Sequence, residues 1–553
     1  MRSVITLALF LFLLPASYAQ SPILVDNITP SSGSSSFGLS IMSPLQGKLV
    51  FTVNDNLLYI TDGTPGGTQL LKEFYFVPNY INFVSTNNKL FFVAADSTHG
   101  DELWATDGTV SGTYIVKDIL PGPGYGIQYG LITMNGKVYF SANDGVHGNE
   151  LWVSDGTSAG TYMVKDIDSG AASGIYDNIV TANNKIFIPG THNSTAQLWI
   201  SDGTDTGTHM ITGESDTSYI YNLISAGDKA YFSKRSGVSS LHPPQVLFYV
   251  SDGTTTGTIA ISGGYNLENT TDYAVVSGKL YFYGSTYNFI SGYNEDQIWS
   301  TDGTTAGTKP IKAGFDFPCS SSGTTMHVFL TSFKNKLYFS FAGYNGPPVN
   351  QLWVSTGDSS GTTMLAEFSP KHNPGPTFAP YPMFLTATDK YIFFKAYDTI
   401  NHRADLWATD GTTAGTKRIN MTGANYTDST LPCGEVATPI AIVDSIVYFS
   451  NEYDTSIGFE LYKLNANVDV PIVPTNADKF NIYPNPAKDQ CTIETTAKNA
   501  LLLIYSISGK LLLHTTLNAT KNNIDLNMFQ PGMYFCMLRS ENDISVKKLV
   551  IER

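Results

Sequence analysis

The sequence predicts an all-β protein: a large β-propeller of about eight to nine four-stranded blades, followed by a small C-terminal β-sandwich. A unit with four strand signals recurs along most of the 553-residue chain, with glycine and asparagine turns between the strands. Residues 480–553 again alternate short apolar segments with turns. Charged residues make up only 14% of the chain, which suits many short strands joined by tight turns.

The repeated unit is marked by a tryptophan in its third strand. The segment ELWVSDGTSAGTYMVKD recurs, and all six tryptophans of the chain occupy the same position in it. Tyrosine replaces tryptophan in three weaker copies, so nine anchors follow one another at intervals of 45 to 55 residues. We expect each large side chain to pack between neighbouring blades. The anchors are Tyr59, Trp104, Trp152, Trp199, Tyr249, Trp299, Trp353, Trp407 and Tyr462.

One complete unit shows the four strands clearly. An apolar segment at 130–134 is followed by the turn Asn135-Gly136 and by the second strand signal, KVYFSA. A variable loop leads to ELWVS, and the turn DGTSAG leads to TYMVKDI. Alternating apolar residues with Asn, Asp and Gly turns predict antiparallel strands. Four strands in a period of about 48 residues are typical of a propeller blade.

The two ends of the repeat region predict how the ring closes. Residues 24–28 resemble the fourth strand at 164–167, and the ninth unit ends at 460–465 without a fourth strand of its own. The N-terminal segment can therefore complete the last blade, which removes an exposed sheet edge. This pattern favours one ring over residues 20–466. An eight-bladed ring with a degenerate unit, two smaller propellers and an open solenoid of hairpins are the alternatives.

The first residues predict export. A basic start, an apolar run from Val4 to Pro15 and the small residues up to Ala19 are typical of a signal peptide cleaved after Ala19. No later stretch is long and apolar enough for a membrane helix, so we expect no transmembrane segment in the mature chain. The expected division is a signal peptide at 1–19, a propeller at 20–466, a linker at 467–479 and a C-terminal domain at 480–553.

The C-terminal domain contains an ordered set of motifs at its two ends and in its middle. They read YPNP, then IYSISGK, then GMY and finally KKLV. With these motifs the tail resembles the type A C-terminal sorting domain of the type IX (Por) secretion system. The resemblance implies a partner in that secretion machinery and a secreted or outer-membrane surface location in a Gram-negative bacterium. The residues that carry it are Tyr483, Pro484, Asn485, Pro486, Gly509, Lys510, Gly532, Tyr534, Lys547 and Lys548.

The repeat region itself resembles the ELWxxDGT repeat proteins, on the ELW and DGT motifs of the unit quoted above. This resemblance covers about four fifths of the chain. It implies an exported repeat protein and supplies no catalytic residue.

The Asp-Gly-Thr turn is the most regular polar feature of the repeat. Its aspartate can accept a backbone N–H two residues on, and a second glycine such as Gly160 is expected to take the left-handed position of the hairpin loop. The turn is therefore expected to be structural. Calcium is the only cofactor with a candidate site, since aspartate oxygens suit that ion, although one carboxylate per turn is few. The candidate ligands are Asp107, Asp155, Asp202, Asp302 and Asp410.

The places where the units differ suggest a binding surface. The second-to-third strand loops are longest at 234–245 and 284–297, and a third insertion at 371–382 follows a fourth strand. Aromatic side chains in Gly-, Ser- and Asn-rich loops suit recognition of glycans or proteins. The candidate ligand residues are Tyr287, Phe289, Tyr293, Phe378 and Tyr381. A merely tolerated insertion is the alternative.

Three histidines each precede a turn aspartate by eight residues. Because His99, His147 and His402 lie in different units, they are expected in polar hairpin loops rather than at one metal. Among the four cysteines, Cys491 can pair with Cys536 and Cys319 with Cys433 in an oxidising compartment.

The net charge of −15 argues against nucleic acid as a partner. No G-x-S-x-G, H-E-x-x-H or phosphate-loop motif is present, so catalysis has no sequence signature. The sequence therefore favours a secreted or surface-displayed binding or adhesion protein with an extracellular glycan or protein ligand. A polysaccharide-acting hydrolase or lyase and a structural envelope component are the alternatives.

Overall fold

The computed structural model of the chain contains two compact units, residues 1–471 and 472–553. The predicted signal peptide at 1–19 and the linker at 467–479 lie outside the described residues. The structure describes residues 22–26, 28, 39–78, 81–211, 219–236, 245–261, 273–288, 293–312, 328–343, 349–368, 382–398, 403–419, 439–454, 458–466, 480–496, 500–506, 511–539 and 544–552.

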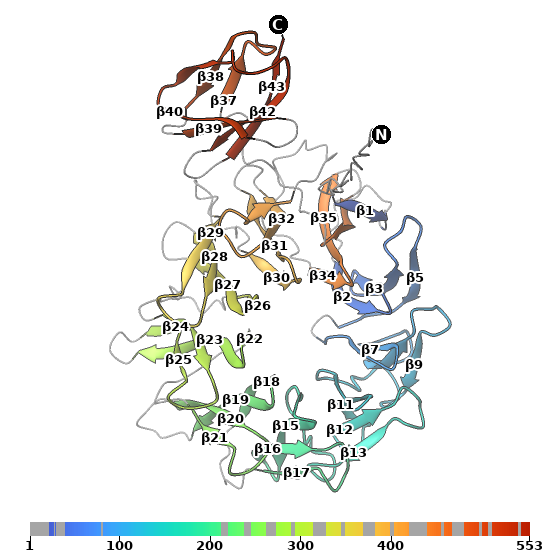
Figure 1. Cartoon of the computed structure of the whole chain (residues 1–553). Helices are drawn as coiled ribbons and strands as arrows, with labels where there is room; N and C mark the ends of the chain where they lie inside the picture. The colour runs from blue at the N-terminus through green and yellow to red at the C-terminus, as the bar shows by residue number, and fades with distance from the viewer. Residues whose placement is uncertain are drawn as a thin grey trace, which may run out of the picture. The chain divides into compact units, whose positions relative to one another are not determined.

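The first unit is a ring of nine four-stranded antiparallel sheets within the described ranges (Figure 1). Blades one to three are β2 (Leu39–Leu45), β3 (Lys48–Val53), β4 (Leu57–Thr61), β5 (Thr68–Glu73); β6 (Val84–Thr86), β7 (Lys89–Ala94), β8 (Glu102–Thr106), β9 (Tyr114–Lys117); and β10 (Ile132–Met134), β11 (Lys137–Asn143), β12 (Asn149–Ser154), β13 (Tyr162–Lys165). Blades four to six are β14 (Val180–Ala182), β15 (Lys185–His192), β16 (Thr195–Ser201), β17 (His209–Met210); β18 (Ile220–Ala226), β19 (Lys229–Ser236), β20 (Gln245–Ser251), β21 (Ile259–Ala260); and β22 (Tyr273–Val276), β23 (Lys279–Asn288), β24 (Tyr293–Thr301), β25 (Lys309–Pro310). Blades seven to nine are β26 (Leu330–Phe333), β27 (Lys336–Gly343), β28 (Val349–Ser355), β29 (Thr363–Glu367); β30 (Met383–Ala387), β31 (Ile392–Asp398), β32 (Arg403–Thr409), β33 (Lys417–Arg418); and β34 (Ala441–Val443), β35 (Ile446–Asp454), β36 (Gly458–Asn465), β1 (Ile23–Asp26).

The strands of each blade follow one another from the centre of the ring outwards, as the repeat predicts. In blade three, β10 pairs with β11, β11 with β12 and β12 with β13, all antiparallel. The first strands, such as β22, β26 and β30, lie nearest the centre in Figure 1, and the fourth strands lie on the rim. The predicted all-β propeller fold is therefore confirmed.

The ring closes in the way that the ends of the repeat region predict. Strand β1 supplies the fourth strand of blade nine and pairs antiparallel with β36, Leu24 lying opposite Tyr462. The Glu460 carboxylate accepts the backbone N–H of Ile28 at 2.9 Å. Val25 is buried in one apolar cluster with Phe51 of blade one and Tyr448 of blade nine. A single ring of nine blades replaces the alternatives of eight blades, two propellers or an open solenoid.

The hydrophobic core of the ring lies between the blades. Each of nine apolar clusters in the described residues joins two neighbouring blades, including blades nine and one. Trp104, for example, is 3% exposed and packs between Leu58 of blade one and Phe92 of blade two. The expectation that the third-strand aromatic packs between blades is confirmed.

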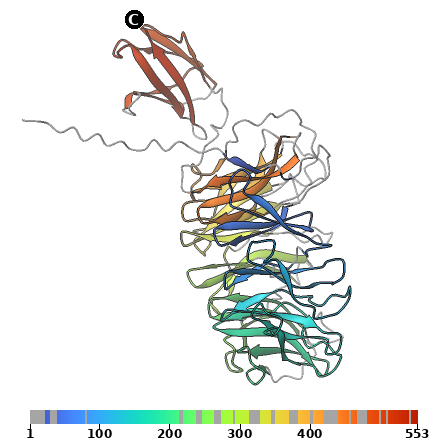
Figure 2. The same ribbon diagram turned by 90° about the vertical axis from the view of Figure 1, so that its right-hand side faces the viewer.

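The topology gives the ring two different ends, between which the strands run (Figure 2). At the turn end, short turns such as 135–136 join first to second strands, and Asp-Gly-Thr turns such as 155–161 join third to fourth strands. At the loop end lie the second-to-third strand loops and the connections between blades. The second-to-third strand loops range in length from the two residues 193–194 to the eight residues 237–244. The connections between blades range from the nine residues 211–219 to the 22 residues 419–440. Of the three insertions predicted from the sequence, 284–297 is in part strand, because 284–288 belong to β23 and 293–297 to β24. Residues 237–244, 289–292 and 371–381 lie outside the described residues.

The second unit is a two-sheet sandwich, as its alternation of apolar segments predicts. One sheet has the order β37-β38-β41 and the other β40-β39-β42-β43. Buried side chains from both sheets, including Ile493 and Leu502, form one core. The strands are β37 (Phe480–Tyr483), β38 (Gln490–Thr495), β39 (Ala500–Ser506), β40 (Leu511–Leu517), β41 (Lys521–Asp525), β42 (Gly532–Arg539) and β43 (Ile544–Ile551).

Candidate functional site

The Asp-Gly-Thr turns at the turn end are held by their own side chains. In blade three, one Asp155 carboxylate oxygen accepts the backbone N–H of Thr157 at 2.9 Å and its hydroxyl at 2.7 Å. The Thr157 hydroxyl accepts the N–H of Gly160 at 3.0 Å. These hydrogen bonds lower the pKa of Asp155. The same aspartate–threonine bonds occur at Asp62, Asp107, Asp202, Asp252, Asp302 and Asp410.

The two glycines of each turn have different roles, and this corrects one expectation from the sequence. The left-handed conformation belongs to the first glycine, Gly156 at φ +89°, and not to the second, Gly160. Gly160 is needed for space, because a Cβ there would overlap the Asp155 carboxylate. The first glycine also faces the preceding blade: a Cβ on Gly203 would overlap the hydroxyl of Tyr139. Each turn therefore packs against the preceding blade.

The calcium candidates are not brought together by the fold. Asp107, Asp155, Asp202, Asp302 and Asp410 lie in the turns of five different blades, and each carboxylate is engaged by its own threonine. In the part of the chain that the structure describes, no three His, Cys, Asp or Glu side chains are grouped as metal ligands.

Two of the three predicted histidines lie at the loop end, each beside an aspartate. His99 Nδ1 lies 3.0 Å from Asp96, and His147 Nδ1 lies 2.8 Å from Asp144. Although partial burial opposes it, hydrogen bonds from Thr98 and His99 hold the pKa of Asp96 well below its usual range. The bond to Asp144 raises the pKa of His147. These are polar hairpin loops, as predicted; His402 lies outside the described residues.

The glutamate of the ELW motif ties the loop end together. Glu102 is fully buried and accepts the backbone N–H groups of Ile119 and Leu120 at 3.0 and 2.7 Å. Glu150 accepts those of Ile167 and Gly174 at 2.6 and 2.7 Å. Burial raises the pKa of Glu102 to about 7 and of Glu150 to about 8, although these hydrogen bonds oppose the rise. Each glutamate holds the connection that leaves its own blade.

We expect the ring to become less stable as the pH rises from 5 to 7. In this range unfolding releases protons that buried Glu102 and Glu150 hold, because an unfolded glutamate has a pKa of about 4.5. The contribution of the two glutamates to stability is fully present below pH 4.5 and is lost as the pH rises through their folded pKa values. Buried Lys395, whose pKa burial lowers to about 7, acts in the opposite direction only above that pH.

The measurement is the unfolding midpoint against pH, followed by tryptophan fluorescence. The double variant Glu102→Gln/Glu150→Gln should be less stable at every pH and should show a flatter slope between pH 5 and 7. An unchanged slope in the variant would assign the pH dependence to other groups.

The predicted ligand-loop residues lie at the loop end where the structure describes them. Tyr287 lies opposite Asn294 and Tyr293 opposite Asn288, at the tip of the long β23–β24 hairpin. Phe289, Phe378 and Tyr381 lie outside the described residues. The fold therefore places two of the five on one hairpin.

Three exposed tyrosines at the loop end were missed by the sequence reasoning. Tyr75 is 81% exposed, Tyr125 65% and Tyr219 59%, and all three lie in connections between blades. No motif marks them, since these connections do not repeat in sequence. Only the fold shows that they share one end of the ring.

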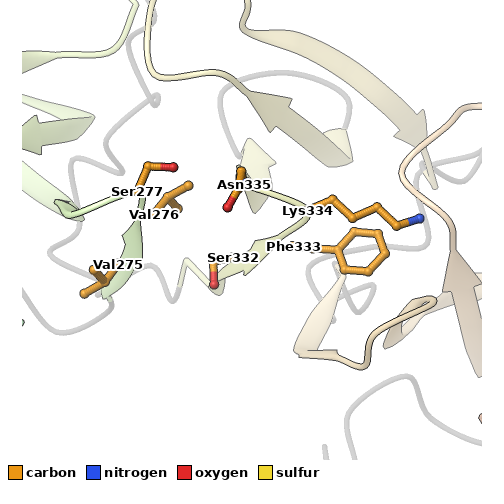
Figure 3. A pocket seen from close by; sticks show the side chains of 7 residues that line it. All are labelled: Val275, Val276, Ser277, Ser332, Phe333, Lys334 and Asn335. Carbon is orange, nitrogen blue, oxygen red and sulfur yellow. The ribbon is translucent and has the colours of Figure 1, made fainter.

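The turn end has a small hollow of about 210 Å³ between blades six and seven (Figure 3). It is lined by residues 275–277 and 332–335 of two neighbouring strand turns. The Lys334 side chain runs past the Phe333 ring, with its ammonium 4.6 Å from the ring centroid and 3.2 Å from the Asp410 carbonyl oxygen. This cation serves the packing of blades seven and eight, so the hollow is not our candidate site.

In the sandwich, the first and last predicted motifs meet. The Asn485 side chain donates to the Lys548 carbonyl at 2.7 Å and accepts the N–H of Val550 at 2.9 Å. Ala487 forms two backbone hydrogen bonds, each 2.8 Å long, with Val550 of β43 and with Glu552, which follows that strand. A segment of the YPNP motif is thereby held against β43.

The other tail residues contribute packing and exposed surface. Tyr483, Pro484, Asn485, Pro486 and Lys548 are exposed, and the Tyr534 hydroxyl donates to the Gln530 carbonyl at 2.6 Å. The exposed Gly532 begins β42, and the Lys547 ammonium lies 3.3 Å from Asn481 Oδ1. Gly509 and Lys510 lie outside the described residues.

The tail cysteines are present as free thiols, so their suggested pairing is not found. Cys491 and Cys536 are both buried in the sandwich core. Burial raises the pKa of Cys491 to about 11 and, with Cys491 nearby, that of Cys536 to about 12. Cys319 and Cys433 lie outside the described residues.

Comparison with known proteins identifies the tail. Residues 481–552 match the family described as "Secretion system C-terminal sorting domain". A funoran endo-beta-hydrolase of Wenyingzhuangia aestuarii is 35% identical over 75 residues, which are 13% of this chain. The chain spans about a tenth of the length of that relative, so the relative's activity does not transfer.

Several solved structures resemble the chain at low similarity. The computationally designed Ika8 protein has a TM-score of 0.38 at 13% identity, covering 68% of this chain and 96% of its own. The dihydro-heme d1 dehydrogenase NirN has 0.34 at 10%, covering 82% and 77%. PorZ of Porphyromonas gingivalis, a surface component of the type IX secretion system, has 0.18 at 11%, covering 95% and 83%. At these scores none bears on the function of this chain.

The sorting domain establishes the route of the protein. It marks a chain exported by the type IX secretion system to the cell surface or the extracellular space of a Gram-negative bacterium, and it implies contact with that machinery. In the described part of the chain, no helix has the length and apolar character needed to cross a membrane.

Proposed function

We propose that the exported chain is a binding or adhesion protein whose recognition surface is the loop end of the ring. The observation that carries this proposal is the contrast between the two ends. The turn end repeats the same short turns, whereas the loop-end segments range in length from the two residues 193–194 to the 22 residues 419–440. Binding residues are disproportionately found on variable loops that a rigid scaffold positions. The ring is then an ELWxxDGT-type propeller at 20–466, after a leader at 1–19 and before a linker at 467–479.

The test is retention of the purified full chain on glycan, polysaccharide and protein arrays, with calcium and with a chelator. A loop-swap variant in which 237–244 are replaced by the Asn-Ser turn of 193–194 should lose at least part of the retention. The matched control changes the turn end, with Gly227-Asp228 replaced by the Asn-Gly of 135–136. Equal loss in both variants, or full retention in the loop-swap variant, would count against the loop end as the recognition surface.

A finer variant set tests the aromatic candidates on the long hairpin. Tyr287→Ala and Tyr293→Ala should weaken retention if that hairpin contacts the ligand, as should Phe289→Ala. Phe378→Ala and Tyr381→Ala test the insertion before blade eight in the same way. If the chain is retained with calcium but not with the chelator, the result would support the calcium hypothesis for the Asp-Gly-Thr turns.

For the tail, we propose that the secretion machinery reads the exposed YPNP segment together with the last strand. This proposal is supported by the two Asn485 side-chain bonds, which hold the two motifs in one surface. Tyr483, Pro484 and Lys548 would present that surface, being exposed beside Asn485.

We expect Asn485→Ala to reduce export without unfolding the ring. The variant removes two hydrogen bonds to β43, at a cost of about 1–3 kcal/mol to the sandwich. The measurement is the ratio of extracellular to periplasmic protein, with amide exchange at Lys548 to Val550 as the local readout. Asn481→Ala is the matched control, because it removes only an exposed 3.3 Å contact with Lys547. If exchange accelerates but export is unchanged, the machinery does not need the combined surface.

A further inference from the structure

The exposed tyrosines at the loop end, called the tyrosine row below, lie in three of the connections between blades. In the described part of the ring, the tyrosines that are more than half exposed are Tyr75, Tyr125 and Tyr219. They lie in the connections that precede blades two, three and five, respectively. A single exposed aromatic side chain needs no explanation. Three exposed tyrosines at the same end of the ring do need an explanation.

Tyr75 and Tyr125 are fixed on the two sides of one loop. The N–H of Tyr75 donates to the Ala95 carbonyl at 2.8 Å, where the second strand of blade two ends. Tyr125 forms a bridge with Asp101, where the third strand begins, and the adjacent Gly124 carbonyl accepts the Asp101 N–H at 3.2 Å. The loop between them carries the Asp96–His99 pair. Both aromatic rings thus project from hydrogen-bonded backbone.

Tyr219 is braced by a neighbouring ring. Tyr176 packs edge-to-face on it, with ring centroids 5.0 Å apart. The Tyr176 hydroxyl is itself fixed, since it accepts the N–H of Ile220 at 2.8 Å. An aromatic side chain that is held in place and still exposed loses little entropy on binding, as is typical of recognition surfaces.

Resting on the loop-end function proposed above, we infer that the tyrosine row Tyr75, Tyr125 and Tyr219 binds an extended, uncharged polysaccharide. Each ring offers a flat apolar face for a sugar ring and a hydroxyl for hydrogen bonding. Because the row crosses several blades, a polymer of repeated sugars can engage the tyrosines together, and its affinity grows with chain length.

The surroundings of the row favour a sugar polymer over a protein. Between Tyr75 and Tyr125 lie Asp96, Thr98 and His99, whose polar atoms interrupt the apolar surface that the core of a protein interface needs. The net charge disfavours acidic polymers: residues 20–466 contain 22 Lys and Arg against 39 Asp and Glu. An anionic polysaccharide would be repelled by the ring as a whole.

The test measures binding of the purified full chain to laminarin, xylan and agarose, with alginate as the acidic comparison, by affinity electrophoresis. Oligosaccharides of increasing length from the retained polymer are then titrated. Each of Tyr75→Ala, Tyr125→Ala and Tyr219→Ala should raise the Kd for the polymer about fivefold to tenfold. The matched control is Tyr162→Ala, because Tyr162 is 47% exposed but lies at the turn end. Unfolding midpoints establish that the variants are folded.

Each possible result either supports or overturns the inference. Retention by an uncharged polymer, tighter binding of longer oligosaccharides and losses confined to the row support the inference. No retention by any of the three uncharged polymers overturns it, as does preference for alginate or an equal loss in Tyr162→Ala. If the variant that combines Tyr75→Ala, Tyr125→Ala and Tyr219→Ala still binds its ligand and the 237–244 loop-swap variant does not, the row fails and the loop-end function stands. If neither change affects binding, both fail.

Discussion

Replacing Val25 with aspartate is expected to destabilise the ring by about 4 kcal/mol or more. Val25 is 2% exposed, on the strand that completes blade nine, and it contacts the apolar cluster shared by blades nine and one. A carboxylate there would be buried without a partner or would separate the two blades. The measurement is chemical unfolding followed by tryptophan fluorescence, which reports on the ring alone because all six tryptophans lie in it.

Ile23 provides the matched control on the same strand. It is 42% exposed, so Ile23→Asp should change the stability by less than about 1 kcal/mol. A strand that closed the ring only through backbone pairing would give similar small effects at both positions. Equal and small losses would therefore contradict the role of Val25 in joining the two blades.

Replacing Gly203 with alanine is expected to cost about 3 kcal/mol or more. Two penalties add at this position. The residue has φ +91°, where an L side chain is strained by about 1–2 kcal/mol. The new Cβ would also overlap the Tyr139 hydroxyl of the preceding blade, and overpacking costs a further 1–3 kcal/mol or so. The unfolding midpoint of the ring measures the sum.

Two further variants separate the penalties. Gly170 has φ +100° but open space where a Cβ would lie, so Gly170→Ala should show the backbone strain alone. Tyr139→Phe removes the hydroxyl, so adding it to Gly203→Ala should recover part of the loss. If Gly170→Ala is as costly as Gly203→Ala, the turn does not depend on its contact with the preceding blade.

The repeat made most of the fold predictable. Tight turns such as 135–136 and the alternation of apolar residues are local signals, so the strands of blade three lie where the sequence predicts them. The third-strand tryptophans and the closing strand at 23–26 followed from comparing one unit with another. Because the unit recurs nine times, strand and turn signals that are weak in one copy are recognised from the others.

What escaped prediction depends on contacts between distant segments. The first glycine of each turn is selected partly by a side chain of another blade, as Gly203 is by Tyr139, and no local rule contains that contact. The Asn485 side chain forms hydrogen bonds with Lys548 and Val550, which lie 63 and 65 positions further along the chain. The tyrosine row has no sequence pattern, because exposed residues need not repeat and only the ring brings their connections to one end.

The closing strand also sets the order in which the protein can fold. Strand β1 precedes the other described strands of the ring, yet its partner is β36, and the Ile28–Glu460 contact spans 432 positions. Blade nine cannot be completed until nearly the whole ring has emerged, so a slow, late step of large contact order is built into folding. Until that step the chain exposes an unpaired edge at β36. The ring is therefore closed only after the strands of its last blade have formed.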